Sequence, residues 1–338
     1  MGIISLNEKR TSTLKHNTTG KQVSYHVGSQ FAEPPSFGGV TTDLEVHYDF
    51  SRTDCWNRNQ STNAADYTVN NLANDYADAL FRDRSTGAFE NGSASSCWSF
   101  NSSEGGGCLQ TVPSNNSDDN DDNVLIIPGA YTSTTDSDFA HDLTTVGSTS
   151  SQNLMNGVGT GAFTIEMWVQ IYVNHSNGGS VHLGRLTSSE VGGSSTDLHA
   201  YAFSYYDAGH SSSSIQGDLR WLEKPDGSDI PNHYIRDFVE TLPGAPGSGA
   251  GWSDWLHLVF SRESGSSNNV KLYCNNSLET TRTNTKNWNY NQYVRIIDVY
   301  SNVSPPTRVG IFRFYKGKAL TSSEVTTNWN DQKARFGH

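Results

Sequence analysis

Glu166 and His257 have side chains suited to acid–base chemistry, and both stand in segments that alternate like β-strands. Hydrolysis of a glycosidic bond needs two carboxyl groups, about 5–5.5 Å apart in retaining enzymes and further apart in inverting ones. Side chains two or four positions apart share a strand face, so a same-strand pair would read Glu-x-Asp or Glu-x-x-x-Glu. Trp168 and Gln170 occupy those positions after Glu166. We therefore expect Glu166 to be a hydrogen-bonded structural residue.

His257 lies between Trp255 and Val259 on one face of its predicted strand. A histidine base needs a nucleophile within hydrogen-bonding reach, and this strand offers only Ser261, four positions on. The sequence contains no Gly-x-Ser-x-Gly turn, no His-Glu-x-x-His motif and no Gly-x-x-x-x-Gly-Lys loop. We predict that His257 is a packed structural histidine and assign no catalytic residue.

The acidic run Asp118–Asp122 carries carboxylate oxygens of the kind that bind Ca²⁺. Asp119 and Asp121 are its weak candidate ligands. The run lacks the glycine at position 6 and the glutamate at position 12 of an EF-hand loop, and acidic low-complexity loops are usually solvated. We expect no metal or cofactor, with calcium as the alternative.

The tryptophans divide into two predicted groups. Trp168, Trp255 and Trp329 stand at periodic positions and should lie in the core. The others stand near predicted loops and should be available for exposure: Trp56, Trp98, Trp221, Trp252 and Trp288. Exposed aromatic rings beside Asn and Asp suit sugars and also protein interfaces, and the sequence does not separate the two. The carbohydrate-binding residues therefore stay unassigned.

Composition narrows the fold and the partners. Lys and Arg number 23 against 35 Asp and Glu, a net charge of −12, which is unfavourable for binding nucleic acid. No apolar run approaches the ~20 residues of a membrane span, and Met1–Arg10 has no apolar core of a secretory signal. The four cysteines show no zinc-site spacing, so we predict buried or incidental thiols in a reducing compartment.

Residues 1–38 differ from the rest of the chain. They are polar and slightly basic, and they end in Pro34-Pro35 and Gly38-Gly39. Within them, Val23, Tyr25 and Val27 alternate like one short strand. The segment is either a disordered tail or an extended arm that pairs with the sheet edge of a neighbouring subunit.

From residue 39 onward, short alternating segments follow one another. In the clearest, Phe163–Ile171, Phe163, Ile165, Met167, Val169 and Ile171 share one face. Further predicted strands are Leu44–Tyr48, Val124–Ile127, Val181–Leu186, Ala200–Tyr206, Asp218–Leu222, Trp255–Ser261, Val270–Cys274, Tyr293–Tyr300 and Arg308–Tyr315. About ten such strands form a two-sheet antiparallel sandwich. Leu72–Phe81 reads as helix or loop, and strands between residues 50 and 162 are otherwise not placed.

One helix is predicted near the end of the sequence. Thr321 and Glu324 form a capping box, in which each side chain satisfies an orphan backbone amide. Val325, Trp329 and Phe336 follow at helical spacing, and Gly337 supplies a left-handed stop.

Several segments, in order, resemble the concanavalin A-like, laminin-G-like domains of tailed-phage and marine-virus structural proteins. They are Gly39–Asp49, Phe163–Trp168, Trp255–Val259, Lys271–Asn275, Val309–Tyr315, Ala319–Val325 and Asn328–Asn330. The resemblance covers residues 39–338. It implies an all-β jelly-roll sandwich used for adhesion, glycan contact or virion architecture more often than for catalysis, and calcium at the sandwich rim in some members.

The resemblance and the residues together favour a non-enzymatic virion structural protein, a capsid-decorating or tail-associated subunit. Its expected partners are other virion proteins or copies of itself, reached through residues 1–38, with neither nucleic acid nor membrane. Its expected location is the virion, after synthesis in the host cytoplasm. The alternative is an adhesin that binds host surface glycans, and the third hypothesis is a glycoside hydrolase whose carboxylates come from different strands.

Overall fold

The fold is a sandwich of two antiparallel sheets, as predicted. The computed structural model describes residues 38–56, 68–73, 78–83, 98–111, 123–127, 154, 158–173, 180–187, 199–206, 219–224, 233–235, 251–265, 267, 269–283, 294–299 and 305–338. They belong to the unit Gly38–His338. The N-terminal arm is predicted over residues 1–38, and all of it except Gly38 lies outside the described residues, so the arm stays a prediction.

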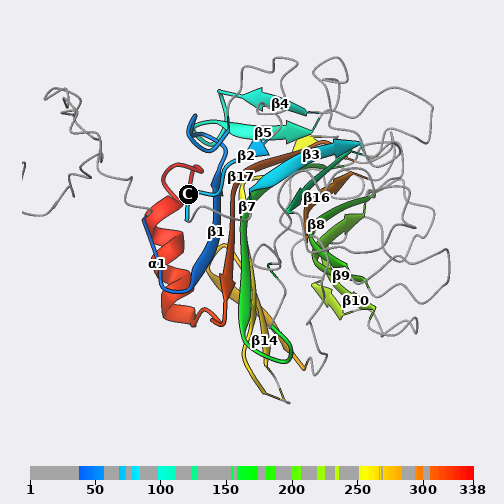
Figure 1. Ribbon diagram of the computed structural model, residues 1–338, viewed down its shortest axis with the longest axis vertical. Helices are drawn as coiled ribbons and strands as arrows, with labels where there is room; N and C mark the ends of the chain where they lie inside the picture. The colour runs from blue at the N-terminus through cyan, green and yellow to red at the C-terminus, as the bar shows by residue number, and fades with distance from the viewer. Residues whose placement is uncertain are drawn as a thin grey trace, which may run out of the picture. The chain divides into compact units, whose positions relative to one another are not determined.

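The first sheet has nine strands and carries the residues with candidate chemistry (Figure 1). Seven follow the order β15-β14-β13-β7-β17-β5-β4, while β1 pairs with β17 and β12 pairs with β7. The strands are β1 (Leu44–Asp49), β4 (Trp98–Asn101), β5 (Cys108–Thr111), β7 (Phe163–Val173), β12 (Gly251–Trp252), β13 (Leu256–Arg262), β14 (Val270–Cys274), β15 (Ser277–Arg282) and β17 (Thr307–Lys316).

The second sheet has eight strands, in the order β11-β10-β9-β8-β16-β6-β3-β2. They are β2 (Thr68–Val69), β3 (Ala79–Asp83), β6 (Asn123–Ile127), β8 (Ser180–Thr187), β9 (His199–Tyr206), β10 (Leu219–Lys224), β11 (His233–Ile235) and β16 (Val294–Val299).

A single hydrophobic cluster joins the two sheets. The alternation of β7 is confirmed: its residues at 163, 165, 167, 169 and 171 all enter this cluster. Leu183 and Phe203 enter it from the second sheet. Removing these apolar side chains from water holds the sheets face to face and leaves the even-numbered residues of β7 on the outer face.

The outer face of β17 depends on a bulge at Gly310. The pairing register of β17 with β7 shifts between Val309 and Ile311. Without the shift, Arg308 and Arg313 would point to opposite sides, because five positions separate them. With it, both reach outer-face residues of β7. A Cβ on Gly310 would lie 2.5 Å from the Phe336 ring, so this position requires glycine.

The helix α1 (Ser322–Gln332) lies alongside β1 and β17 (Figure 1). Its predicted capping box is present, with Thr321 and Glu324 each bonding the other's backbone N–H. The helix ends earlier than predicted, so Phe336 lies in the turn that follows it. Gly337 adopts a positive φ of 83°, as expected for a left-handed stop. The turn folds Phe336 back onto Trp168, which covers part of the outer face.

Most predicted strands are present within a residue or two. The prediction of helix or loop for Leu72–Phe81 agrees with the bend at Leu72 and Ala73 but is wrong at the end of the segment. Its last residues belong to β3, which pairs with β6 so that Leu80 lies opposite Ile126. Pairing with a distant strand and burial of Phe81 outweigh the weak helical spacing. The strands β2, β4, β5, β11, β12 and β15 had not been predicted.

Two tryptophans expected near the surface are buried. Trp56 is 1% exposed, with its ring 5.5 Å from that of Phe81, and Trp98 is 4% exposed, with its ring 5.1 Å from the same phenylalanine. The sequence on either side of Trp56 is typical of a loop, which favoured an exposed position. Packing against residues distant in the sequence buries the ring instead. Cys55, Cys108 and Cys274 are free and buried, as predicted.

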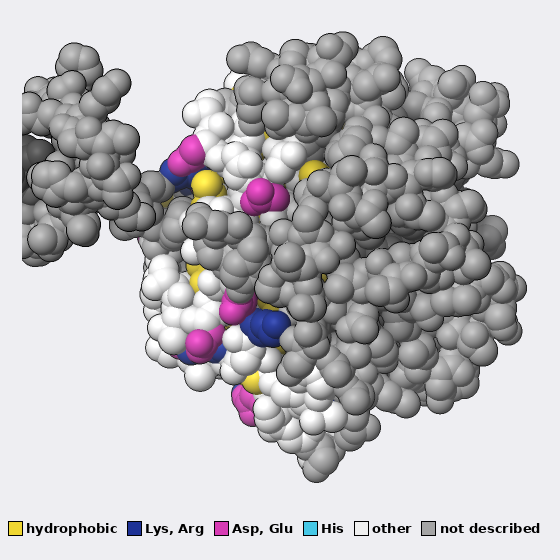
Figure 2. All heavy atoms as spheres, in the orientation of Figure 1, with side chains coloured by type: hydrophobic (Ala, Val, Ile, Leu, Met, Phe, Trp, Pro, Cys, Tyr) yellow, Lys and Arg dark blue, Asp and Glu magenta, His cyan; other side chains and the backbone are white. Residues whose placement is uncertain are grey.

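The described residues on one face of the molecule carry mixed charge. On the face shown in Figure 2, the acidic and basic side chains that are drawn in colour lie scattered among neutral ones. Across the described ranges, no helix is both long and apolar enough to cross a membrane.

Candidate functional site

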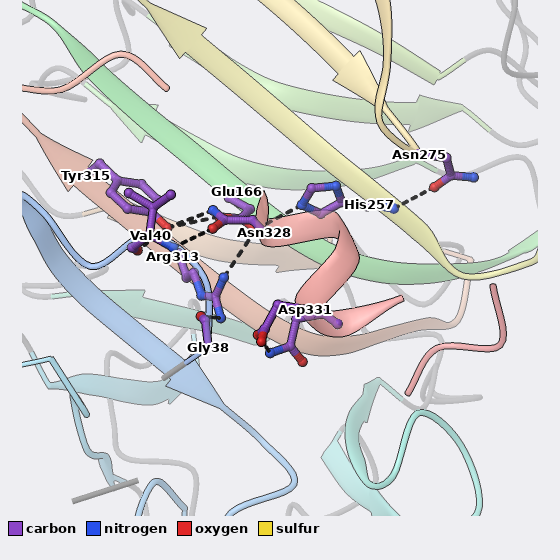
Figure 3. A network of polar contacts seen from close by, with 10 residues as sticks. Gly38, Val40, Glu166, His257, Asn275, Arg313, Tyr315, Asn328 and Asp331 are labelled. Carbon is purple, nitrogen blue, oxygen red and sulfur yellow. Dashed lines mark hydrogen bonds and ion pairs between the residues drawn. The ribbon is translucent and has the colours of Figure 1, made fainter. Parts of the chain in front are cut away.

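The sheet register brings Glu166 and His257 together on the outer face. In the pairing of β7 with β13, Trp168 lies opposite His257 and Glu166 lies opposite Val259. The His257 ring turns toward Glu166, and its Nε2 lies 2.8 Å from Oε1 of the carboxylate (Figure 3). Because a carboxylate only accepts, the ring carries its proton on Nε2 and donates.

Three further side chains surround the Glu166 carboxylate. Arg313 Nη1 lies 3.4 Å from Oε1, while Asn328 Nδ2 donates to Oε2 over 2.7 Å and the Tyr315 hydroxyl lies 3.2 Å from Oε2. Asn328 comes from α1, and the other two from β17. Both carboxylate oxygens are therefore occupied by groups from three separate elements.

The same network holds the start of the described chain. Asn328 Oδ1 accepts a hydrogen bond of 2.7 Å from the Val40 N–H, and Arg313 Nη2 donates to the Gly38 carbonyl over 3.3 Å. The Tyr315 hydroxyl also lies 3.1 Å from the Val40 carbonyl. Glu166 thus fixes α1 and the segment before β1 against the sheet (Figure 3).

This network is closed to a substrate. Glu166 and His257 are both 0% exposed, and Trp168 stacks on His257 with ring centroids 4.8 Å apart. A general acid must reach the leaving oxygen, and neither side chain can. Both side chains are buried and hydrogen-bonded within the network, which is the arrangement expected of structural residues.

Burial opposes ionisation of Glu166, but the Arg313 guanidinium and the hydrogen bonds from His257 and Asn328 outweigh it and lower the pKa of the carboxyl. A carboxyl with a lowered pKa in the folded state adds stability above its unfolded pKa of about 4.5. That contribution to stability is lost as the pH falls through the pKa of Glu166 in the folded state.

We therefore predict a difference in acid stability between the wild type and the Glu166→Gln variant. Between pH 6 and pH 3, the wild type should lose free energy of unfolding more steeply than the variant, because only it must protonate Glu166. Urea unfolding at each pH measures this. Parallel profiles would contradict the assigned role.

A second outer-face cluster is partly open and forms the candidate binding surface. Arg308 lies directly opposite Gln170 of β7 and Gln110 of β5, so the register sets three polar side chains in a row. Arg308 Nε donates to Gln110 Oε1 over 2.8 Å, and Nη1 donates to Gln170 Oε1 over 2.6 Å. Gln170 in turn donates to the Ser253 carbonyl. Gln170 is therefore held through both its amide oxygen and its amide nitrogen, and the Gln110 oxygen accepts from Asn101 as well as from Arg308.

Two aromatic rings border this row. Trp252 of β12 lies opposite Tyr172 of β7, with ring centroids 5.4 Å apart and planes 80° apart. The guanidinium carbon of Arg308 lies 3.7 Å from the Trp252 ring centroid, a cation–π contact that orders the indole. Trp252 and Tyr172 are both partly exposed. Rings and amides side by side can contact the CH faces and the hydroxyls of a sugar.

Part of this surface could be predicted from the sequence. Trp252 was among the tryptophans expected to be exposed, and among those of them whose side chains are described it is the one that is partly exposed. Arg308, Gln110 and Tyr172 were missed, because their convergence depends on strand order and on the bulge at Gly310. The one available signal was the alternation that put Gln170 on the outer face.

Other predicted site residues lie outside the described part of the chain. Asp119, Asp121 and Trp288 are not described, nor is the side chain of Trp221. Among the residues that are described, no three His, Cys, Asp or Glu side chains gather in a way that could hold a metal ion. The calcium alternative stays untested.

Neither a protein-family model nor a curated protein matches this sequence. Solved structures match the fold. One of them is a structure of botulinum neurotoxin type C, whose cell entry is described as dependent on interaction with two ganglioside molecules. It has 10% sequence identity and a TM-score of 0.51, and the match covers 86% of this chain and 51% of that chain. The binding domain of Paraclostridial Mosquitocidal Protein 1 has 12% identity and a TM-score of 0.48, covering 86% and 52%. This likeness concerns the fold alone, and the chain spans about half the length of these structures.

Proposed function

We propose that this chain is a non-enzymatic, glycan-binding module with an adhesin-like role. The observation that carries the proposal is the open outer-face surface of Trp252 and Tyr172 beside the ordered row Gln170, Arg308 and Gln110. Ring faces suit the apolar CH groups of a sugar, and fixed amides suit its hydroxyls.

The fold gives the proposal a second support. The type C neurotoxin structure, whose fold this chain shares over 86% of its length, is one for which interaction with gangliosides is described. Glycan binding on such a sandwich is therefore compatible with the architecture. The absence of an exposed acid–base pair at Glu166 and His257 favours binding over hydrolysis.

Substitution Trp252→Ala tests the surface. A single partly exposed aromatic contact contributes about 1–2 kcal/mol, so affinity for a bound glycan should fall about five- to thirtyfold. Binding is measured on a broad panel of host surface polysaccharides, with and without Ca²⁺. Leu278→Ala serves as the matched control, because Leu278 is a 49% exposed apolar side chain on the edge strand β15.

Two results would oppose the proposal. Failure of the wild type to bind any polysaccharide would remove glycan binding itself. Equal loss in Trp252→Ala and Leu278→Ala, or no loss in either, would move the binding site away from this surface.

The virion placement remains a second candidate, supported by the ordered sequence resemblance and by the anchoring of the chain where it enters the sandwich. Gly38 and Val40 are held by Arg313 and Asn328, so any segment before them leaves the sheet at a fixed point. An arm that leaves from a fixed point suits assembly with a neighbouring subunit.

We therefore predict that the full chain forms a defined oligomer, whereas a truncated chain that begins at Gly38 is a folded monomer. Light scattering gives both masses, and circular dichroism checks folding. Two compact monomers would assign residues 1–37 no assembly role and leave glycan binding as the function.

A further inference from the structure

Arg308 is a buried cation with mainly neutral neighbours. The residue is 8% exposed, and its hydrogen bonds go to the amide oxygens of Gln110 and Gln170. Amide oxygens satisfy N–H donors but bring no opposite charge. The positive charge is therefore held in place without being neutralised by these partners.

Glu104 compensates the charge weakly. Its Oε1 lies 3.6 Å from Arg308 Nη1, and its side chain is 41% exposed. Pairs this open to solvent contribute little. Two other arginines that reach the outer face have a closer or more buried carboxylate partner than Arg308 has. Arg313 faces the buried Glu166, and Arg335 Nη1 lies 2.8 Å from Asp49 Oδ2.

One nitrogen of Arg308 remains available. Within the described ranges, Nη2 donates to no protein group, and it is not among the buried polar atoms that lack a partner. It therefore reaches solvent, beside the Trp252 ring on which the guanidinium rests. Burial lowers the pKa of Arg308 from its usual value, consistent with incomplete compensation of the cation.

We propose that this surface recognises an acidic saccharide, in which a carboxylate accepts from Arg308 Nη2 while Trp252 and Tyr172 contact the sugar ring. The inference rests on the proposed glycan-binding function and names the ligand class for that same surface. A charge-assisted hydrogen bond from a guanidinium already held in position is the strongest recognition this surface offers.

The test compares each ligand with its own neutral form. Isothermal titration uses oligosaccharides of galacturonate, glucuronate and mannuronate, each beside its carboxyl-reduced counterpart. At least one acidic form should bind about tenfold more tightly than its reduced form. Its affinity should fall as salt rises, because the added ions screen the charge on Arg308.

Three variants locate the preference. Arg308→Gln should abolish the preference for the acidic form while circular dichroism shows a folded protein. Glu104→Gln, on an exposed side chain that is free to change, should strengthen acidic binding about threefold by removing a competing anion. Lys271→Gln, which removes an exposed cation of the same sheet that pairs with Glu263, should change nothing.

The outcomes separate the two proposals. If neutral glycans bind and no acidic form binds more tightly than its reduced form, the proposed ligand class is wrong but glycan binding stands. If the preference survives in Arg308→Gln, or Glu104→Gln leaves acidic affinity unchanged, Arg308 is not the anion site. If nothing binds, glycan binding itself fails.

Discussion

Glu166→Ala should lower the free energy of unfolding by about 3–5 kcal/mol, since removing one partner of a buried ion pair leaves the other charge uncompensated. Arg313 is 0% exposed, and Glu166 is the carboxylate that faces it at 3.4 Å. The variant also removes the acceptor for His257 and Asn328, so the contact of α1 with the sheet loses its centre. Urea unfolding at pH 7 measures the loss.

A double substitution separates charge from packing. In Glu166→Leu combined with Arg313→Met, no charge is left buried, so much of the lost stability should return. Lys271→Ala provides the surface comparison, because it breaks the exposed pair with Glu263 and should cost less than about 1 kcal/mol. Equal, small losses in Glu166→Ala and Lys271→Ala would contradict the anchoring role of Glu166.

Trp168→Ala should also lower the free energy of unfolding by about 3–5 kcal/mol, the range for truncating a buried aromatic side chain. Trp168 is 0% exposed and stacks between elements: its ring lies 4.3 Å from Phe336, 5.2 Å from Trp329 and 4.8 Å from His257. The substitution leaves a cavity under α1 and under the turn that follows it. Denaturant unfolding gives the loss, and near-ultraviolet circular dichroism reports the stack.

Trp168→Phe is the matched control, because it keeps an aromatic ring in the stack and should retain most of the stability. A loss below about 1 kcal/mol in Trp168→Ala would mean that the stack does not hold α1 to the sheet.

Many of the strands and the helix could be predicted from local patterns. Alternation marked β7 with its inward face, and the capping box marked the first turn of α1, because each signal lies within a few residues. The pattern failed where distant contacts decide the outcome. Leu80 joins a strand because β6 and β2 pair with it, and distant Phe81 and Phe100 help to bury Trp56.

The same limit applies to the candidate site. Glu166 and His257 could each be assigned a structural role, but their contact depends on the register of β7 with β13. The row of Arg308 with Gln170 and Gln110 joins residues up to 198 positions apart and needs the bulge at Gly310 to face outward. No spacing rule along one chain encodes such a row.

Glycan contact at Trp252 can be observed directly from the indole N–H signals of ¹⁵N-labelled protein during titration with the tightest-binding acidic oligosaccharide. Trp252→Phe assigns the Trp252 signal, and Trp168→Phe assigns that of the buried Trp168. We predict a saturating shift of the Trp252 signal, while the Trp168 signal stays in place beneath Phe336. Saturating shifts at other tryptophans with Trp252 unchanged would place the glycan elsewhere and contradict the proposed site.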